Sequence, residues 1–230
     1  MQRILLVEDD HSISEVIHHY LTKEDFQVEL AFDGEEGIRL FQHNSYDLIL
    51  LDLMLPKLNG IDFLKLIREQ SNIPVLIISA KDGEVEKALG LGFGADDYIA
   101  KPFSMIELTA RVKAAIRRAT QYSSSEPAEE KVLQVHDLTI DIENVSVLKI
   151  GKPLQLTSTE WQLLKLFATN PKKVFTKEQI YRSVWNEDYF DDQNIINVHM
   201  RRLREKIEDD PSSPQYIKTL WGIGYKWGEF

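Results

Sequence analysis

The segments ILLVEDD (residues 4–10) and LILLDLMLP (residues 48–56) decide the fold, because each is a short apolar run that ends in carboxylates. Neither run alternates apolar with polar residues, so neither has a face for solvent. Continuously apolar strands of this kind are typical of parallel sheets covered on both faces. Similar apolar runs recur at residues 28–31, 75–78 and 98–100. The sequence therefore predicts five buried strands in its first half.

Helix-favouring segments separate and follow these five runs. They are residues 12–23, 34–43, 60–69, 84–91 and 104–118. Short buried strands that alternate with helices indicate parallel pairing through crossover connections. We therefore expect residues 1–118 to form an α/β domain, a doubly wound five-stranded parallel sheet.

The pattern changes after residue 118. Residues 119–131 are rich in Ser, Glu and Ala and lack apolar periodicity, which is typical of a flexible linker. Beyond them, alternating runs at 132–157 predict a small antiparallel sheet, and a Gly-containing hairpin is expected at 216–227. Helical periodicity is present at 159–169, 176–185 and 193–208. Residues 132–230 are thus expected to form a smaller α+β domain.

Composition excludes several classes of protein. The chain has no Cys, which removes disulfides and thiolate chemistry, and it has no apolar run of about 18 residues that could cross a membrane. We therefore expect a cytoplasmic protein with no membrane partner. The formal net charge is −10, with 13 Lys/Arg against 20 Asp/Glu in residues 1–120 and 14 against 17 in the rest. Neither half is basic, so any DNA binding must come from a local patch.

Reactive side chains follow the apolar runs. Ligands of open parallel sheets bind beyond the carboxyl ends of the strands, so these positions are expected to meet in space. The first run ends in Glu8-Asp9-Asp10, the third in Asp52, the fourth in Ser79 and the fifth in Lys101. Crowded carboxylates repel one another unless a cation lies among them, and oxygen ligands favour Mg²⁺.

With Mg²⁺ bound, Asp52 could act as a nucleophile toward phosphorus, while Lys101 and Ser79 meet the charge on the phosphoryl oxygens. Each residue also has a plain structural interpretation: Asp9 and Asp10 as charges at a helix N-terminus, and Lys101 as a solvated lysine. The coincidence of all these residues at successive strand ends favours the phosphoryl site.

A phosphatase that uses an aspartyl nucleophile is an alternative function. Haloacid-dehalogenase-type phosphatases carry a second aspartate two residues after the nucleophile, as general acid and base. Here that position holds Met54, so turnover of external substrates is not expected and the chain is predicted not to be an enzyme.

The segment 193–208 is predicted to be a helix with two faces. Its apolar stripe consists of Ile196, Met200, Leu203 and Ile207. The opposite face carries Asn194, Asn197, Val198, Arg201, Arg202 and Arg204. Arg can bind guanine bidentately, Asn can read adenine and Val can contact a thymine methyl group, so this face suits the DNA major groove. A solvated basic face is the alternative.

Four motifs carry a family resemblance over residues 1–118. ILLVEDD, LILLDLMLP, LIISA and DDYIAKPF resemble the receiver domain of bacterial response regulators, which has a flavodoxin-like fold. The resemblance implies that Asp52 accepts a phosphoryl group from a sensor histidine kinase. It also implies that Mg²⁺ lies among Asp9, Asp10, Asp52 and the Met54 carbonyl. Ser79 and Tyr98 would then act as switch residues.

Residues 132–230 resemble the OmpR/PhoB-type effector domain, a winged helix-turn-helix, through LTSTEWQLLKLFATNP, INVHMRRLREKI and YIKTLWGIGYKW. The resemblance implies that helix 193–208 enters the major groove and hairpin 216–227 reaches the minor groove of double-stranded DNA. Further contacts are then expected at Arg182, Trp185, Thr219, Trp221 and Tyr225. Family members often carry Arg where this chain has Trp221, so stacking or apolar contact is expected there.

The resemblance also implies two protein partners. Loop 186–192 is acidic and lies where relatives contact RNA polymerase, although simple solvation would also explain its charge. A phosphorylation-dependent homodimer would read direct-repeat half-sites. Its interface residues would be Lys87, Asp96, Asp97, Glu107, Arg111 and Arg117. Surface ion pairs are individually weak, so this charged face could instead serve solubility. A regulator with a vestigial pocket that binds DNA constitutively is a further alternative.

Overall fold

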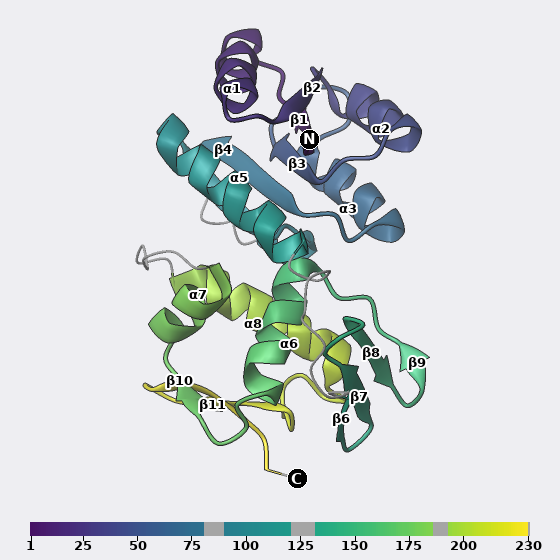
Figure 1. Cartoon of the computed structure of the whole chain (residues 1–230), viewed down its shortest axis with the longest axis vertical. Helices are drawn as coiled ribbons and strands as arrows, with labels where there is room; N and C mark the ends of the chain where they lie inside the picture. Colours follow the sequence, from purple (N-terminus) through teal and green to yellow (C-terminus); the bar gives the residue numbers. More distant parts are fainter. Residues whose placement is uncertain (81–89, 121–131, 186–192, 230) are drawn as a thin grey trace. The chain divides into compact units, whose positions relative to one another are not determined.

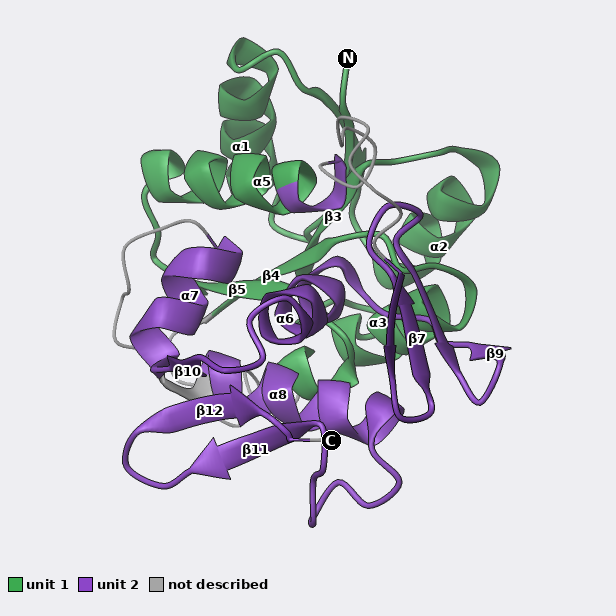
Figure 2. Cartoon of the chain, turned by 60° about the horizontal axis from the view of Figure 1, so that its bottom comes forward, with its two compact units in different colours: residues 1–117 green, residues 118–230 purple. Residues whose placement is uncertain are grey.

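The computed structural model describes residues 1–80, 90–120, 132–185 and 193–229. The chain divides into two compact units, an N-terminal unit of residues 1–117 and a C-terminal unit of residues 118–230 (Figure 2). The predicted helix 84–91 falls largely on residues 81–89, which lie outside the described part of the chain, as do most of the predicted linker and the acidic loop 186–192.

The N-terminal unit is built on a five-stranded parallel sheet in the order β2-β1-β3-β4-β5 (Figure 1). Its strands are β1 (Arg3–Val7), β2 (Gln27–Ala31), β3 (Leu48–Asp52), β4 (Val75–Ala80) and β5 (Asp97–Lys101). Its named helices are α1 (His11–Lys23), α2 (Gly34–His43), α3 (Gly60–Gln70) and α5 (Met105–Thr120). The predicted fold class is confirmed.

Both faces of this sheet are buried, which explains why its strands are apolar throughout. Ile4 and Leu6 face a cluster that includes Ile17 of α1 and Val112 of α5. Alternate strand residues point to the other face, where Val7 lies close to α2 and α3. A Cβ added to Gly37 would lie 3.1 Å from Val7 and 2.8 Å from the ring of Phe63. The helices therefore pack on the sheet at close range from both sides.

Helix α5 extends further than the sequence pattern predicts. It continues to Thr120, so residues 119 and 120, which were expected to begin the linker, are helical. Arg118 is buried, Ala119 is half-buried and Thr120 is exposed. Residues 119 and 120 are Ala and Thr, which do not extend the apolar period of the helix, and that explains the early boundary.

The C-terminal unit combines two antiparallel sheets with three helices. One sheet has the order β6-β7-β8-β9 and the other β10-β12-β11. The strands are β6 (Val132–Val135), β7 (Leu138–Asp141), β8 (Ser146–Lys149), β9 (Lys152–Pro153), β10 (Val174–Phe175), β11 (Ile217–Leu220) and β12 (Gly224–Trp227). The helices are α6 (Ser158–Ala168), α7 (Lys177–Trp185) and α8 (Gln193–Ile207). This is the winged-helix arrangement expected from the sequence.

Strand β10 is the element that the sequence pattern missed, since two residues carry no usable period. It pairs with β12 of the hairpin, Phe175 opposite Tyr225. Gly224 makes that pairing possible: its φ is +153°, and a Cβ there would lie 2.0 Å from the Phe175 carbonyl oxygen. The terminal hairpin is thus attached to the helical core.

A buried carboxylate joins α6 to α8. Glu160 is fully buried and forms ion pairs with Arg202 at 2.7 Å and with Lys206 at 2.6 Å. It also completes a capping box with Thr157 at the start of α6. Burial would raise the pKa of Glu160, but the charges of Arg202 and Lys206 outweigh it and hold that pKa below its usual value.

This arrangement predicts acid-sensitive stability of the C-terminal unit. The contribution of Glu160 is fully present above the unfolded-state pKa of about 4.3 and is lost as the pH falls through the lower folded-state value. Removing one partner of a buried ion pair costs about 3 kcal/mol, so Glu160→Gln should lower the free energy of unfolding by about that amount at pH 7.

Urea unfolding followed by tryptophan fluorescence measures the stability of the C-terminal unit in both proteins, because all four tryptophans lie there: Trp161, Trp185, Trp221 and Trp227. The difference in unfolding free energy between the wild type and Glu160→Gln should narrow below about pH 4, because the unfolded wild-type chain takes up a proton on Glu160 there before the folded chain does. An equal difference at pH 3 and pH 7 would contradict this role for Glu160.

Candidate acidic site and nucleic-acid interface

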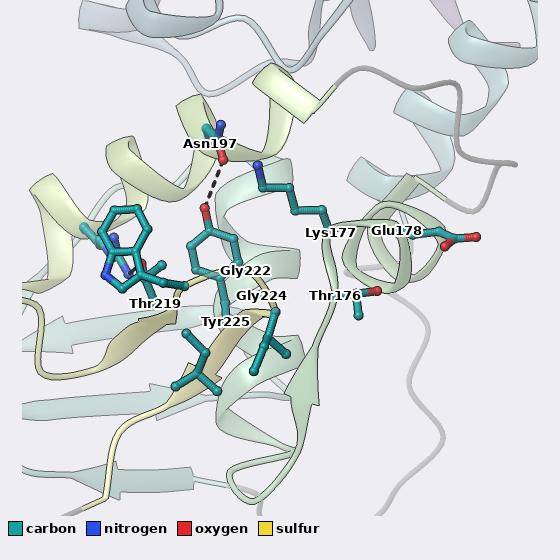
Figure 3. Close-up of a pocket in the computed structure, with 12 residues that line it drawn as sticks. Thr176, Lys177, Glu178, Asn197, Thr219, Gly222, Gly224 and Tyr225 are labelled. Atoms are coloured by element: carbon teal, nitrogen blue, oxygen red, sulfur yellow. Dashed lines mark hydrogen bonds between the residues drawn. The ribbon is translucent and has the colours of Figure 1, made fainter.

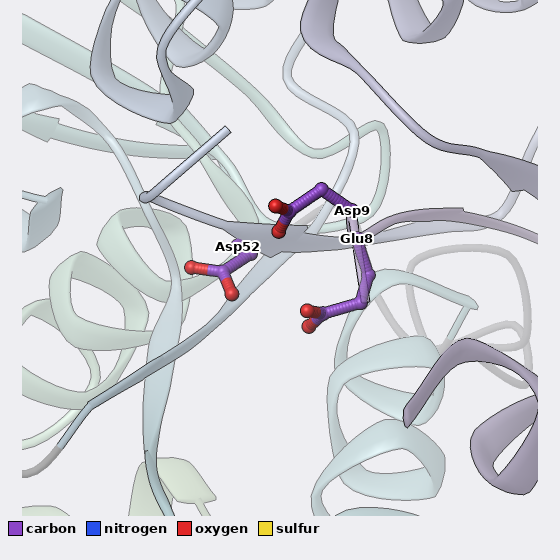
Figure 4. A group of neighbouring side chains, drawn as sticks. All are labelled: Glu8, Asp9 and Asp52. Atoms are coloured by element: carbon purple, nitrogen blue, oxygen red, sulfur yellow. The ribbon is translucent and has the colours of Figure 1, made fainter. Parts of the chain in front are cut away.

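Three carboxylates meet where β1 and β3 end, on neighbouring strands of the parallel sheet. They belong to Glu8, Asp9 and Asp52, and one oxygen from each lies within 4.8 Å of the others (Figure 4). Glu8 and Asp52 are buried, whereas Asp9 is exposed. The strand ends predicted to meet therefore do meet, and they offer oxygen atoms alone.

Lys101, at the end of β5, is the cation that holds this cluster together. Its Nζ donates to both oxygens of Glu8, at 2.9 and 2.7 Å, and to Asp52 Oδ2 at 2.5 Å. Burial lowers the pKa of Lys101, but the bonds to Asp52 and Glu8 raise it above its usual value overall. One lysine among three carboxylates leaves a surplus of negative charge.

The surplus of negative charge affects the pKa of Glu8. Burial and the neighbouring Asp52 charge raise the pKa of Glu8 to about 7, although the hydrogen bond from Lys101 opposes them. A carboxyl group that takes up a proton near neutral pH is one whose charge is incompletely compensated. A divalent cation would supply the missing compensation.

Asp10, which the sequence predicts as a metal ligand, lies outside this cluster of carboxylates. Its Oδ1 accepts from the backbone N–H groups of Ser12 at 2.8 Å and Ile13 at 3.1 Å, so Asp10 is the N-cap of α1. The pattern of Asp before a helix is a capping signature, and capping turns the side chain toward the helix. Glu8, and not Asp10, is the third carboxylate that lies beside Asp9 and Asp52.

The loop after β3 is folded back against Asp52. The Met54 backbone N–H donates to Asp52 Oδ1 at 2.9 Å, and the Gly60 N–H donates to the Leu53 carbonyl at 3.0 Å. A Cβ on Gly60 would lie 2.3 Å from the Asp52 carbonyl oxygen. Glycine therefore lets α3 begin directly behind the acidic residue, and the Met54 backbone lies beside its carboxylate. The Met54 side chain itself is exposed.

Two predicted switch residues lie on the neighbouring strands. Ser79 is fully buried on β4, the strand that pairs with β3, and its Oγ has no hydrogen-bond partner among the residues that the structure describes. Tyr98 is also buried, on β5. A buried hydroxyl without an acceptor costs free energy, so Ser79 is a donor suited to an incoming oxygen.

The acidic residues expected at a dimer interface form ion pairs within the chain. Asp96 is buried, accepts from Arg68 at 2.9 Å and accepts from the Val75 N–H at 3.1 Å, so it is an interior group and not a surface contact. Asp97 is buried and pairs with Arg111 at 3.1 Å, and Arg111 also pairs with Glu107 at 3.1 Å.

Arg117 is half-buried on α5. Lys87 lies outside the described residues.

Helix α8 has the two faces that were expected. The apolar stripe of Ile196, Met200, Leu203 and Ile207 is buried. On the other side Asn197 is exposed and Val198 is half-buried. The Arg201 side chain is 80% exposed and pairs with Glu205 at 2.9 Å, while the Asn194 side chain lies outside the described part.

Two residues predicted to contact DNA, Arg202 and Trp185, are buried in the structure. Arg202 is buried in its ion pair with Glu160, and Trp185 is fully buried and stacked on Tyr181 with ring centroids 5.1 Å apart. An Arg one position after an exposed Arg turns by about 100° around the helix axis, which brings it to the α6 side. Arg182 on α7 remains at the surface, paired with Glu178 at 3.0 Å.

Arg204 and Tyr225 connect α8 to the hairpin. Arg204 donates to the Ile217 carbonyl and, at 2.9 Å, to Thr219 Oγ1. The Tyr225 hydroxyl donates to Asn197 Oδ1 at 3.1 Å, the bond drawn in Figure 3. The amide of Asn197 is thereby oriented with its NH₂ donor available. The Asn197 oxygen keeps a second lone pair, so the amide can still donate and accept together, as bidentate reading of adenine requires.

These groups line a groove of ≈ 690 Å³ between the start of α7, α8 and the hairpin. Thr176, Lys177 and Glu178 contribute from the α7 side, and Thr219 to Tyr225 from the hairpin (Figure 3). Helix and hairpin thus present one continuous surface. Among the described residues no helix is both long enough and apolar enough to cross a bilayer.

Comparison with known proteins matches each unit to a family. Residues 4–113 match the family described as "Response regulator receiver domain", and residues 151–227 match "Transcriptional regulatory protein, C terminal". The chain is 84% identical to the "Uncharacterized transcriptional regulatory protein YcbL" of Bacillus subtilis (strain 168), covering 98% of this chain and 100% of that protein.

Two further relatives extend the comparison. The chain is 38% identical to the "Sensory transduction protein RegX3" of Mycolicibacterium smegmatis, over 98% of this chain and 99% of that one. Among solved structures it is similar to the response regulator DrrB, a Thermotoga maritima OmpR/PhoB homologue, with 30% identity, complete coverage of both chains and a TM-score of 0.52.

The close approach at Gly60 predicts a steric test of the acidic site. Gly60→Ala places a methyl group against the backbone of Asp52 and should lower the free energy of unfolding by about 2 kcal/mol. Gly92→Ala is the matched control, because nothing lies within 4 Å of its added Cβ and alanine favours helix; it should be neutral or stabilising. Urea unfolding followed by circular dichroism measures both, and equal stabilities would contradict the packing described for Gly60.

Proposed function

The chain belongs to the OmpR/PhoB-type two-component response regulators, and we propose that phosphorylation of Asp52 in its receiver domain controls DNA binding by its C-terminal unit. The observation that carries this proposal is the convergence of Glu8, Asp9, Asp52 and Lys101 at the carboxyl ends of β1, β3 and β5. The chain is a DNA-binding regulator by family, with a receiver domain followed by a transcriptional regulatory domain.

We propose Mg²⁺ as the cofactor of the receiver domain. The donor set is entirely oxygen and carries more negative charge than Lys101 can balance, which fits a hard divalent cation. Glu8, Asp9 and Asp52 would hold it, with the Met54 backbone adjacent, and Asp10 would not. When bound, Mg²⁺ would lower the repulsion between these carboxylates and an incoming phosphoryl group.

Asp52 is the proposed acceptor of a phosphoryl group from a sensor histidine kinase. One carboxylate oxygen would attack phosphorus while the bond from phosphorus to the kinase imidazole nitrogen breaks, and the imidazole keeps the electron pair. Lys101 already contacts Asp52 Oδ2 and would move to an oxygen of the transferred group. The buried hydroxyl of Ser79 would donate a hydrogen bond to an oxygen of the transferred group. The movement of Ser79 toward that oxygen would transmit the effect of phosphorylation to Tyr98.

A groove beside Lys101 is the proposed docking place of the kinase. It has a volume of ≈ 570 Å³ and lies between α1 and the start of α5; its lining includes Ser12, Ile13, Val16, Lys101, Phe103 and Met105. Val16 and the neighbouring Tyr20 are about half exposed, at 49% and 48%. A helix of the kinase seated there would bring its phosphohistidine next to Asp52, which is what direct transfer requires.

Phosphorylation is proposed to favour a homodimer that reads direct-repeat half-sites in promoter DNA. Within one chain Asp97, Arg111 and Glu107 satisfy one another, so a dimer through this face would exchange those pairs for pairs between chains. Contact of residues 186–192 with RNA polymerase also remains a proposal. These partners place the proposed activity in the cytoplasm.

If Asp52 is the acceptor, Asn substitutions of Asp52, Asp9 and Asp10 should affect phosphorylation to different extents. With acetyl phosphate and Mg²⁺, the wild type should gain one phosphoryl group by intact-protein mass spectrometry, and Asp52→Asn should gain none. Asp9→Asn should be labelled more slowly, because it removes a proposed Mg²⁺ ligand. Asp10→Asn should be labelled as well as the wild type, since Asn is an equally good N-cap. Labelling of Asp52→Asn would overturn the assignment.

The docking groove predicts that two phosphodonors respond differently to one substitution. Val16→Asp places a charge in the apolar groove, so transfer from the cognate kinase should fall about tenfold or more. Labelling by acetyl phosphate, which needs no docking surface, should be unchanged. Radiolabel transfer assays measure both rates. Unimpaired transfer from the kinase to Val16→Asp would contradict docking of the kinase in this groove, but it would not contradict Asp52 as the acceptor.

A further inference from the structure

The tip of the β11–β12 hairpin is apolar and projects into solvent. Trp221 is 91% exposed, more than any other large apolar side chain in the described part of the chain, and Ile223 beside it is 61% exposed. The other three tryptophans, Trp161, Trp185 and Trp227, are buried. Exposed Trp forfeits a large burial free energy, so two adjacent apolar side chains at one tip indicate a surface that another molecule covers.

The tip is held rigidly. The Ile223 N–H donates to the Leu220 carbonyl at 2.9 Å and closes the turn, while Gly222 adopts a φ of +73° that other residues rarely adopt. The hairpin is also fastened to α8 through the Tyr225 and Arg204 bonds described above. Trp221 is therefore presented in a fixed position relative to the exposed face of α8.

The surroundings of the tip are positively charged although the whole chain carries −10. Lys218 is exposed on β11, and the groove shared by helix and hairpin includes Lys177 and Arg204 against a single carboxylate, Glu178. Cations around an apolar tip complement a molecule that offers phosphates outside and flat apolar faces inside. Duplex DNA has this chemistry, with phosphates flanking a minor groove and stacked bases within it.

We propose that Trp221 and Ile223 enter the DNA minor groove as an apolar wedge, which partly unstacks a base step and bends the duplex. The proposal rests on the DNA binding assigned to the C-terminal unit under the proposed function. A charged tip would be attracted by the negative potential of a narrow minor groove. An apolar tip instead gains binding free energy by contact with unstacked bases. The preferred sequence at that position should then be a flexible pyrimidine–purine step, which is the least costly to open.

Trp221 provides its own probe, because it is the exposed tryptophan while the other three are buried. The DNA probe is the duplex that the full-length wild-type protein enriches from a random library. Binding of that duplex should reduce acrylamide quenching of the protein fluorescence and should bend the duplex, measured by energy transfer between dyes at its ends. Trp221→Ala should weaken binding about tenfold and abolish the bend, whereas Trp221→Phe should keep most of both.

Three further variants distinguish a wedge at this tip from a general loss of apolar surface and from a phosphate contact. Ile150→Ala removes an apolar side chain, 72% exposed, from another hairpin tip of the same unit and should leave affinity unchanged. Trp221→Arg should bind with a salt slope steeper by about 0.9, the value of one added phosphate contact. Arg201→Ala should weaken binding without affecting the bend, which tests α8 independently of the tip.

The outcomes are distinguishable. Unchanged quenching on DNA binding, or a Trp221→Ala variant that binds and bends DNA like the wild type, would overturn the wedge and leave DNA binding intact. Failure of the wild type to enrich any duplex would overturn the proposed DNA binding and the wedge with it. Protection of Trp221 that rises with protein concentration in the absence of DNA would assign the tip to a second copy of the chain and overturn the wedge.

Discussion

The negative charge shared by Glu8, Asp9 and Asp52 is the constraint on which the N-terminal unit depends. Parallel strands bring their carboxyl ends to one edge, and β1 and β3 are neighbours, so these carboxylates cannot avoid one another. Lys101 compensates part of the charge from the end of β5. The remaining negative charge supports the proposal that the site binds a divalent cation and, with it, a phosphoryl group. Gly60 allows the start of α3 to lie against the backbone of Asp52, the proposed acceptor.

The C-terminal unit uses charge in the opposite way. Its buried carboxylate, Glu160, is fully compensated by two cations and fixes α8 against α6. That leaves a helix face, a groove and a hairpin tip for contact with DNA. Arg204 contributes through the hairpin, since it binds the Ile217 carbonyl and Thr219 and so sets the position of the wing relative to the helix. Arg202 thus joins α8 to α6, and Arg204 joins α8 to the hairpin.

The sequence was sufficient for the fold because its dominant signals are local. Continuous apolar runs identified the five parallel strands, and the helical period of residues 196–207 identified the buried stripe of α8. It was insufficient where one residue type serves two purposes. Glu8 and Asp10 both follow the first apolar run. The structure is needed to show that the Asp10 side chain caps α1, because the capping bonds depend on the residue at which α1 begins.

Arg202 shows the same limit for the DNA-binding face. A positive charge on a helix looks the same from the sequence whether it faces a phosphate or a buried glutamate, and Glu160 lies 42 positions earlier in the chain. Only the residue that contacts Arg202 in the folded chain distinguishes the two cases.

Coupling between the two units is best measured as the affinity of the full-length chain for the duplex that it enriches from a random library, with and without beryllofluoride and Mg²⁺. We expect tighter binding by the wild type alone, and no change in Asp52→Asn. Equal affinities for the wild type in both conditions would contradict control of DNA binding through Asp52.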